Sequence, residues 1–171
     1  MTSRSDLLVA VFDSVGEGLV VHADDGRIMA CNPAAERILG LTRQQMEGRT
    51  STDPRWRAVH ADGSPFPGED HPAMVCLRTH ESVRDVPMGV TRPDGTYVWI
   101  QVSAEPFDME GEPGVVASFT DVTAEAARSS ARMRATVDSM LDPHVLLHAQ
   151  RGADGRVADV VVAEANDGAV L

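Results

Sequence analysis

The spacing of hydrophobic positions changes several times along the chain, and each change marks a predicted element. Residues 5–15 have apolar side chains three and four positions apart, which predicts a short amphipathic helix. Its apolar positions are Leu8, Val11, Phe12 and Val15. Short apolar runs at 19–22 and 27–31 flank an Asp-Gly pair, which indicates a β-hairpin. The first 31 residues are therefore expected to form a helix and two antiparallel strands.

Helix signals follow the hairpin. Asn32 suits an N-cap and Pro33 the first helical position, and Gly40 ends the helix that they begin. The capping-box spacing at 42–45 predicts a second short helix. Residues 49–70 are rich in Asp, Gly, Pro and Ser, so we expect an irregular insert there, with room for one short strand.

The next part of the chain alternates between helix and strand patterns. A helix is predicted over residues 72–80, followed by strands at 86–92, 97–107 and 115–120. In the longest strand, alternation places Trp99 on the face opposite to the apolar positions. These positions are Val98, Ile100, Val102 and Ala104. A hairpin, then helices, then a three-stranded meander predict an α+β fold with helices on one face of an antiparallel sheet.

A long helix is predicted from residue 123 to about residue 140. Small or apolar side chains recur at spacings of four and three, which is a heptad pattern over about two heptads. They are Ala126, Ser130, Met133, Val137 and Met140. The helix could lie on its own sheet or form a parallel dimer stalk. The presence of Ala and Ser in the pattern does not decide between the two, and we favour the stalk.

The first hairpin recurs near the end of the sequence. Residues 12–32 and 137–166 share three features in the same order: an apolar-Asp-Ser-apolar tetrapeptide, an apolar run ending in His-Ala, and an Asp-Gly-Arg turn. The repeat predicts a tandem module whose second copy stops after its first hairpin. A segment this short cannot bury a core alone, so we expect the chain to be a piece of a longer protein.

Charge and cysteine content exclude several classes of partner. The chain has 26 acidic and 15 basic residues and a net charge of -11. It therefore lacks the basic surface expected for nucleic-acid or membrane contact. The sequence shows no signal peptide and no apolar run long enough to span a membrane, which predicts a cytoplasmic location. Cys31 and Cys76 fit a reducing compartment and form neither a disulfide framework nor a structural zinc site.

Four motifs in order resemble the PAS sensory-domain family over about residues 8–123. The first consists of residues 18–21, 25–28 and 32–35 (Gly-Leu-Val-Val, Asp-Gly-Arg-Ile and Asn-Pro-Ala-Ala), and the second of residues 38–40 and 46–48 (Ile-Leu-Gly and Met-Glu-Gly). The third consists of residues 92–96 (Arg-Pro-Asp-Gly-Thr) with Trp99 and Pro106, and the fourth of residues 119–123 (Phe-Thr-Asp-Val-Thr).

The resemblance implies a five-stranded antiparallel sheet of order 2-1-5-4-3 with helices on one face. It divides the chain into an N-terminal cap helix over 1–17, a PAS domain over 18–122 and a signalling helix over 123–141. Residues 142–171 resemble the start of a second PAS domain.

The implied function is a non-catalytic sensor. Such a module detects a small molecule or a partner, and its exit helix passes the signal to an effector outside this chain. The effector would be a histidine kinase, a diguanylate cyclase or a phosphatase, and the module would form a homodimer. Asp121 and Thr123 are the residues expected to couple the last strand to the helix. The alternative is a ligand-free module for protein–protein interaction and dimerisation.

A sensory pocket would lie between the inner sheet face and the helices. The candidate pocket residues are Val20, His22, Met74, Leu77, Ile100, Val102 and Phe119. The alternative is that these side chains fill a dry core and that His22 is an ordinary histidine of the core or its edge. Trp99, Met133 and Val137 are the candidate dimer contacts, although the helix at 5–15 or 123–140 could instead cover Trp99 within the same chain.

No cofactor is identified by the sequence. Haem could use His71 or His80, but His71 precedes Pro72 as a cap residue and His80 lies at the helix end, which disfavours haem. Flavin photochemistry is excluded because neither cysteine lies in the required Asn-Cys-Arg-Phe-Leu-Gln stretch.

The residues that most resemble a set of metal ligands lie in the insert. We interpret them as part of a solvated acidic loop rather than as the site of a metal-dependent enzyme. The members of this metal-like group are His60, Asp62, Glu69, Asp70 and His71. Their spacing matches no known ligand pattern, and motifs of catalysis are absent from the sequence.

Overall fold

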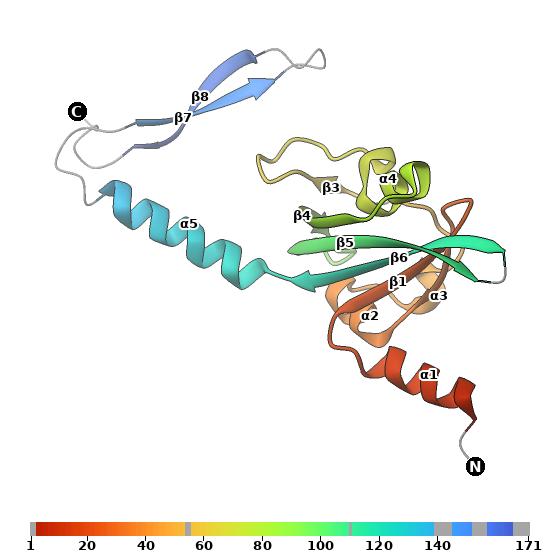
Figure 1. The fold of residues 1–171 in the computed structure, drawn as a ribbon. Helices are drawn as coiled ribbons and strands as arrows, with labels where there is room; N and C mark the ends of the chain where they lie inside the picture. Colours follow the sequence, from red (N-terminus) through yellow and green to blue (C-terminus); the bar gives the residue numbers. More distant parts are fainter. Residues whose placement is uncertain (1–2, 54–55, 110, 139–144, 152–156, 166–171) are drawn as a thin grey trace. The chain divides into compact units, whose positions relative to one another are not determined.

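The computed structural model describes residues 3–53, 56–109, 111–138, 145–151 and 157–165 (Figure 1). Contacts divide the chain into two units, residues 1–123 and 124–171, and each is described by itself. Among the described residues, no helix has both the length and the apolar character needed to cross a membrane.

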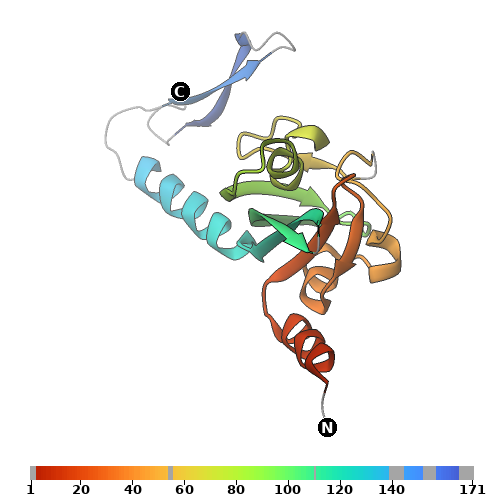
Figure 2. The same cartoon turned by 45° about the vertical axis from the view of Figure 1, so that its right-hand side comes forward.

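The first unit is built on a six-stranded antiparallel sheet of order β2-β1-β6-β5-β4-β3. The strands are β1 Gly18–Ala23, β2 Ile28–Cys31, β3 Ala58–Val59, β4 Val83–Thr91, β5 Tyr97–Met109 and β6 Glu112–Asp121. They twist along the sheet, so β1 and β2 run at a steep angle to β4 and β5 (Figure 2).

The expected five strands are present in the expected order, and β3 corrects their number to six. It comes from the irregular insert and pairs with β4 at the edge of the sheet, with Ala58 opposite Val90. A strand of two residues is too short to show alternation of apolar and polar side chains. The sequence therefore allowed a short strand in the insert but did not locate it.

The predicted alternation of the long strands is confirmed. Val98, Ile100, Val102 and Ala104 are all buried on β5, and Val115, Ala117 and Phe119 are buried on β6. Val102 pairs with Phe119 and Ala104 with Ala117, so the two sets share one face. This face carries the core.

The helices of the first unit are α1 Arg4–Ser14, α2 Pro33–Leu39, α3 Arg43–Met46 and α4 Pro72–Thr79. The Asn32 side chain caps α2 by accepting a hydrogen bond from Ala35 N at 2.9 Å. Gly40 ends this helix in the left-handed conformation, with φ 67°. The capping box at Thr42 and Gln45 begins α3. The capping residues of α2 and α3 and the glycine that ends α2 are therefore confirmed at the positions predicted from the sequence.

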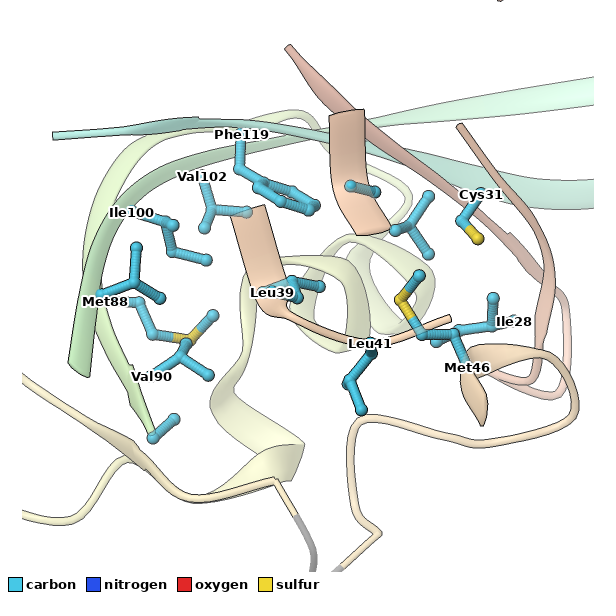
Figure 3. Packing of buried hydrophobic residues seen from close by; sticks show 14 of the residues in the cluster. Ile28, Cys31, Leu39, Leu41, Met46, Met88, Val90, Ile100, Val102 and Phe119 are labelled. Atoms are coloured by element: carbon cyan, nitrogen blue, oxygen red, sulfur yellow. The ribbon is translucent and has the colours of Figure 1, made fainter. Parts of the chain in front are cut away.

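Two clusters of buried side chains join the helices to the sheet. Leu39 on α2 and Met46 near the end of α3 belong to the larger cluster with Ile100, Val102 and Phe119 (Figure 3). Ala73 and Cys76 on α4 pack in a second cluster with Ala104, Val115 and Ala117. All these sheet residues lie on one face, as expected for the fold class.

Helix α1 forms but buries none of its residues. Its apolar side chains Leu7, Leu8, Val9 and Val11 are each more than half exposed. Of the predicted apolar stripe, Leu8 and Val11 are therefore exposed, whereas Phe12 and Val15 are half-buried.

Helix α5, Thr123–Asp138, begins at the last residue of the first unit and belongs otherwise to the second. The second unit also contains a hairpin of β7, Val145–Arg151, with β8, Val157–Ala165. The two strands pair antiparallel, with Leu147 opposite Val162. Met140, residues 142–144, the Asp154-Gly155 turn and Asn166 lie outside the described residues. The assignment of 142–171 to a second PAS domain stays a prediction.

Candidate functional site

A small cavity of about 80 Å³ lies between the inner sheet face and the helices. Its apolar walls come from the sheet, through Ile100, Val102 and Phe119, and from Leu39 and Met46 (Figure 3). A water needs about 10–15 Å³ by this measure, so the cavity has room for roughly five to eight of them. A compact ligand of about as many non-hydrogen atoms would fill the space.

Five of the seven candidate pocket residues line this cavity. They are Val20, His22, Ile100, Val102 and Phe119. The structure places Met74 and Leu77 elsewhere, partly buried against the second cluster. The side of α4 that faces the sheet carries Ala73 and Cys76, because small side chains let the helix approach closely. Met74 and Leu77, expected on the helix that closes the pocket, therefore do not line the cavity.

His22 contributes a polar group to the cavity and is only 4% exposed. Its Nδ1 lies 3.0 Å from the carbonyl oxygen of Gly26. Since a carbonyl oxygen only accepts, this contact places the ring proton on Nδ1 and leaves a lone pair on Nε2. Burial lowers the pKa of His22 from its usual value, although the Gly26 contact partly opposes this, and the charge of His71 lowers it further.

His71 lies at the start of α4, as expected, but its side chain does not cap the helix. The ring is buried against the cavity instead, with Nε2 3.2 Å from the carbonyl oxygen of Phe66. This contact places the proton on Nε2 and leaves the lone pair on Nδ1. Burial again lowers the pKa of the imidazole. Sequence reasoning missed this residue for the cavity, because the irregular insert before it shows no periodicity.

Trp56 is a further cavity residue that the sequence did not single out. Its Nε1 is buried and has no hydrogen-bond partner among the described residues. A buried donor without an acceptor costs about 1–3 kcal/mol. The polar part of the cavity thus combines two imidazoles and an indole, with Ser51 nearby on the wall.

A polar cluster joins the end of β6 to α2 through Arg92, the residue that follows β4. Asp121 Oδ1 accepts a hydrogen bond from Thr123 N at 2.9 Å, and Asp121 Oδ2 lies 3.6 Å from Arg92 Nη2. Arg92 Nε in turn donates to the carbonyl oxygen of Ile38 at 2.8 Å. Thr123 Oγ1 accepts from Trp99 N at 2.9 Å. The two candidate coupling residues, Asp121 and Thr123, therefore bond to each other, to Arg92 directly after β4, and to β5.

The candidate dimer contacts have mixed surroundings. The side chain of Trp99 is half-buried and packs edge-on against Tyr97, with ring centroids 5.7 Å apart. Met133 on α5 is 53% exposed. The side chain of Val137 lies outside the described residues. Their role in a dimer stays a prediction.

The metal-like group of the insert is not assembled in the described part of the chain. His60 stacks on Phe66 with ring centroids 3.9 Å apart, and no three His, Cys, Asp or Glu side chains among the described residues gather into a metal site. His80 ends α4 in an exposed left-handed position, with φ 58°. Cys31 and Cys76 are buried free thiols, and burial raises the pKa of each.

Several solved structures of PAS domains share the fold of this chain. The PAS domain of an HTR-like protein from Haloarcula marismortui is 24% identical, covers 68% of this chain and 90% of its own, and superposes with a TM-score of 0.53. A PAS domain from Colwellia psychrerythraea is 19% identical with a TM-score of 0.54, over 71% of this chain and 99% of its own. A PAS domain of a two-component sensor histidine kinase is 10% identical with a TM-score of 0.53, over 69% of this chain and 96% of its own.

No curated protein matches the chain. The sequence model of the PAS domain matches residues 16–124, which is more than half of the chain. The chain therefore belongs to the PAS domain family.

Proposed function

We propose that this PAS domain is a non-catalytic sensory module that relays the state of its cavity to α5. The observation that supports the proposal is a row of polar contacts between the cavity wall and Thr123. Leu39 lines the cavity, and the carbonyl of the preceding residue, Ile38, accepts a hydrogen bond from Arg92. Arg92 also contacts Asp121, which binds Thr123 N. A shift of α2 would thus change the contacts at the first residue of α5.

The ion pair between Arg92 and Asp121 is weak enough for ligand binding to form or break it. The two side chains are 24% and 41% exposed, and ion pairs at such exposure contribute roughly 0–1 kcal/mol. A ligand shifts a two-state module only through its different affinities for the two states. A difference of this size is enough to make or break the contact.

The signal would leave through α5 to an effector outside this chain. A histidine kinase is consistent with the kinase PAS domain that shares the fold, and a diguanylate cyclase or phosphatase would be reached in the same way. In this proposal the module works in the cytoplasm as a homodimer, with Trp99, Met133 and Val137 as the contacts.

A ligand-free interaction module is the second candidate, and the size of the cavity favours it. About 80 Å³ is less than the roughly 300 Å³ at which pockets for drug-sized ligands begin. Tyr97 is 40% exposed beside Trp99, so an aromatic pair is available to a protein partner. The two candidates differ in whether a small molecule in the cavity changes α5.

Replacing Asp121 with alanine tests the relay. The change removes the acceptor that Thr123 N and Arg92 share, so we expect amide hydrogen exchange in the first turn of α5 to rise several-fold. Protection of β5 should stay the same, because the Asp121 side chain is largely on the surface. In a protein that carries the effector, the output should no longer follow the stimulus.

Asp24→Ala is the matched control, since Asp24 is an exposed aspartate with no ion pair among the described residues. It makes the same change in charge and should leave both exchange and output as they are. Unchanged exchange at α5 together with unchanged signalling in Asp121→Ala would refute the relay.

A further inference from the structure

We infer that the cavity binds a compact aliphatic monocarboxylic acid, whose single acidic proton is taken by one of the two imidazoles in the cavity, His22 or His71. The hydrocarbon part of the acid would lie against the apolar walls. The inference rests on the proposed sensory function and names the class of ligand that its cavity would detect.

The first step is the state of the two histidines. Each ring gives one nitrogen to a backbone carbonyl, Gly26 for His22 and Phe66 for His71. The second nitrogen of each ring has no hydrogen bond among the described residues. Because each carbonyl contact fixes the proton on the bonded nitrogen, the second nitrogen is a bare acceptor. A ligand that satisfies these nitrogens has to bring a proton.

The second step is charge. The residues that line the cavity include no Asp, Glu, Lys or Arg. A cationic amine or a bare anion would therefore place an uncompensated charge in an apolar space, which is costly. A carboxylic acid avoids this cost, because transfer of its proton to an imidazole gives an imidazolium–carboxylate pair with no net charge. The O–H bond of the acid breaks, an N–H bond forms, and the pair gains a charge-assisted hydrogen bond.

The third step is size and the remaining polar group. The cavity of about 80 Å³ takes roughly five to eight non-hydrogen atoms, which corresponds to an acid of about three to six carbons, because the carboxyl group supplies two oxygens. Trp56 lines the same cavity with a buried Nε1 that lacks an acceptor among the described residues. A carboxylate oxygen of the ligand would be an acceptor for the Nε1–H group of this indole. An alcohol of equal length brings a proton but forms no ion pair.

Titration of the complete 171-residue chain with sodium butyrate, followed by calorimetry in two buffers of different ionisation enthalpy, tests the inference. Butyrate is ionised near neutral pH, so binding should take up about one proton from solvent. The affinity should then fall about tenfold for each pH unit between 6.5 and 7.5. The other charged or titratable groups that act on the two rings are Asp70, Glu69 and His60 at His71, and His71 itself at His22. Butanol and butylamine should bind at least tenfold more weakly than butyrate.

His22→Asn and His71→Asn should each reduce butyrate affinity at least tenfold and reduce the proton uptake. His80→Asn is the matched control, because His80 is exposed at a left-handed position that Asn adopts readily. If a cavity variant does not fold, ring resonances of the histidines in the unchanged protein give the same information. Butyrate should raise the apparent pKa of two of the six histidines and leave the other four unaffected.

Several results would overturn the inference: no butyrate binding, equally tight butanol binding without proton uptake, or binding that His22→Asn and His71→Asn leave unchanged. These results are separate from the test of the relay. If butyrate binds as described but exchange at the start of α5 does not change, the ligand class stands and the relay fails. If butyrate does not bind but Asp121→Ala still uncouples output, the relay stands and the ligand class is wrong.

Discussion

At the scale of single residues, the side chain of Asn32 connects three elements of the fold. Its side chain is fully buried, and Oδ1 accepts hydrogen bonds from Leu19 N and Ala35 N, both at 2.9 Å. Nδ2 donates to the carbonyl oxygens of Glu17 at 2.9 Å and Phe12 at 3.2 Å. The Asn32 amide therefore supplies hydrogen-bond partners to backbone groups at the start of α2, near the end of α1 and in β1. The sequence identified Asn32 as a cap of α2, but its bonds to α1 and β1 depend on the tertiary structure.

Asn32→Ala should be strongly destabilising for this reason. Loss of an N-cap costs about 1 kcal/mol, and each buried backbone group left unpaired costs about 1–3 kcal/mol. We expect the free energy of unfolding in urea to fall by about 2–4 kcal/mol. Thr42→Ala, which removes only the exposed cap of α3, should cost about 1 kcal/mol. Equal losses in the two variants would show that the bonds of Asn32 to α1 and β1 contribute little.

At the scale of elements, Gly18 on β1 leaves room for the phenyl ring of Phe119 on β6. This residue pairs with Phe119, and a Cβ added to Gly18 would overlap the phenyl ring. The ring lines the cavity and packs with Val102. The glycine thus determines where one wall of the cavity lies.

Gly18→Ala should push the Phe119 ring from its place, at a cost of about 1–3 kcal/mol in the free energy of unfolding. Gly16→Ala provides the control, because an added Cβ at Gly16 meets no atom within 4 Å and should change stability little. Chemical denaturation of the two variants measures the difference. If both variants were equally stable, the ring would have moved at no cost, contrary to the close packing inferred here.

The elements also differ in how far the sequence could predict them. Strands β5 and β6 follow from alternation, because one face of each is buried and the other is not. The inward side of α4 did not follow, since it carries the small residues Ala73 and Cys76, and large side chains dominate a periodicity analysis. The place of His71 in the cavity also depends on how the insert folds back, and no local pattern encodes that.

At the scale of the whole molecule, three segments distant in sequence meet at Arg92. The motif that contains Arg92 was recognised in the sequence, but its bond to Ile38 spans 54 positions and follows from tertiary structure alone. Asp121 completes the connection to α5. The family resemblance singled out Asp121 and Thr123 as candidates for coupling, a role that stays a prediction, whereas their connection to α2 through Arg92 had to come from the structure.

A double-mutant cycle on Arg92 and Asp121 measures how strongly these segments are coupled. Arg92→Ala removes both the ion pair and the bond to the Ile38 carbonyl, so it should destabilise the domain more than Asp121→Ala does. The interaction energy of the pair should be about 0.5–1 kcal/mol, because the side chains are partly exposed. Arg92→Lys keeps the charge but lacks the guanidinium geometry for two partners, so it should behave more like Arg92→Ala than like the parent chain. Urea unfolding of the four chains gives the energy, and hydrogen exchange at the first turn of α5 gives the readout. Additive effects on both would mean that α2 and α5 respond independently, and the path from the cavity to α5 would then have to run through the backbone of β6.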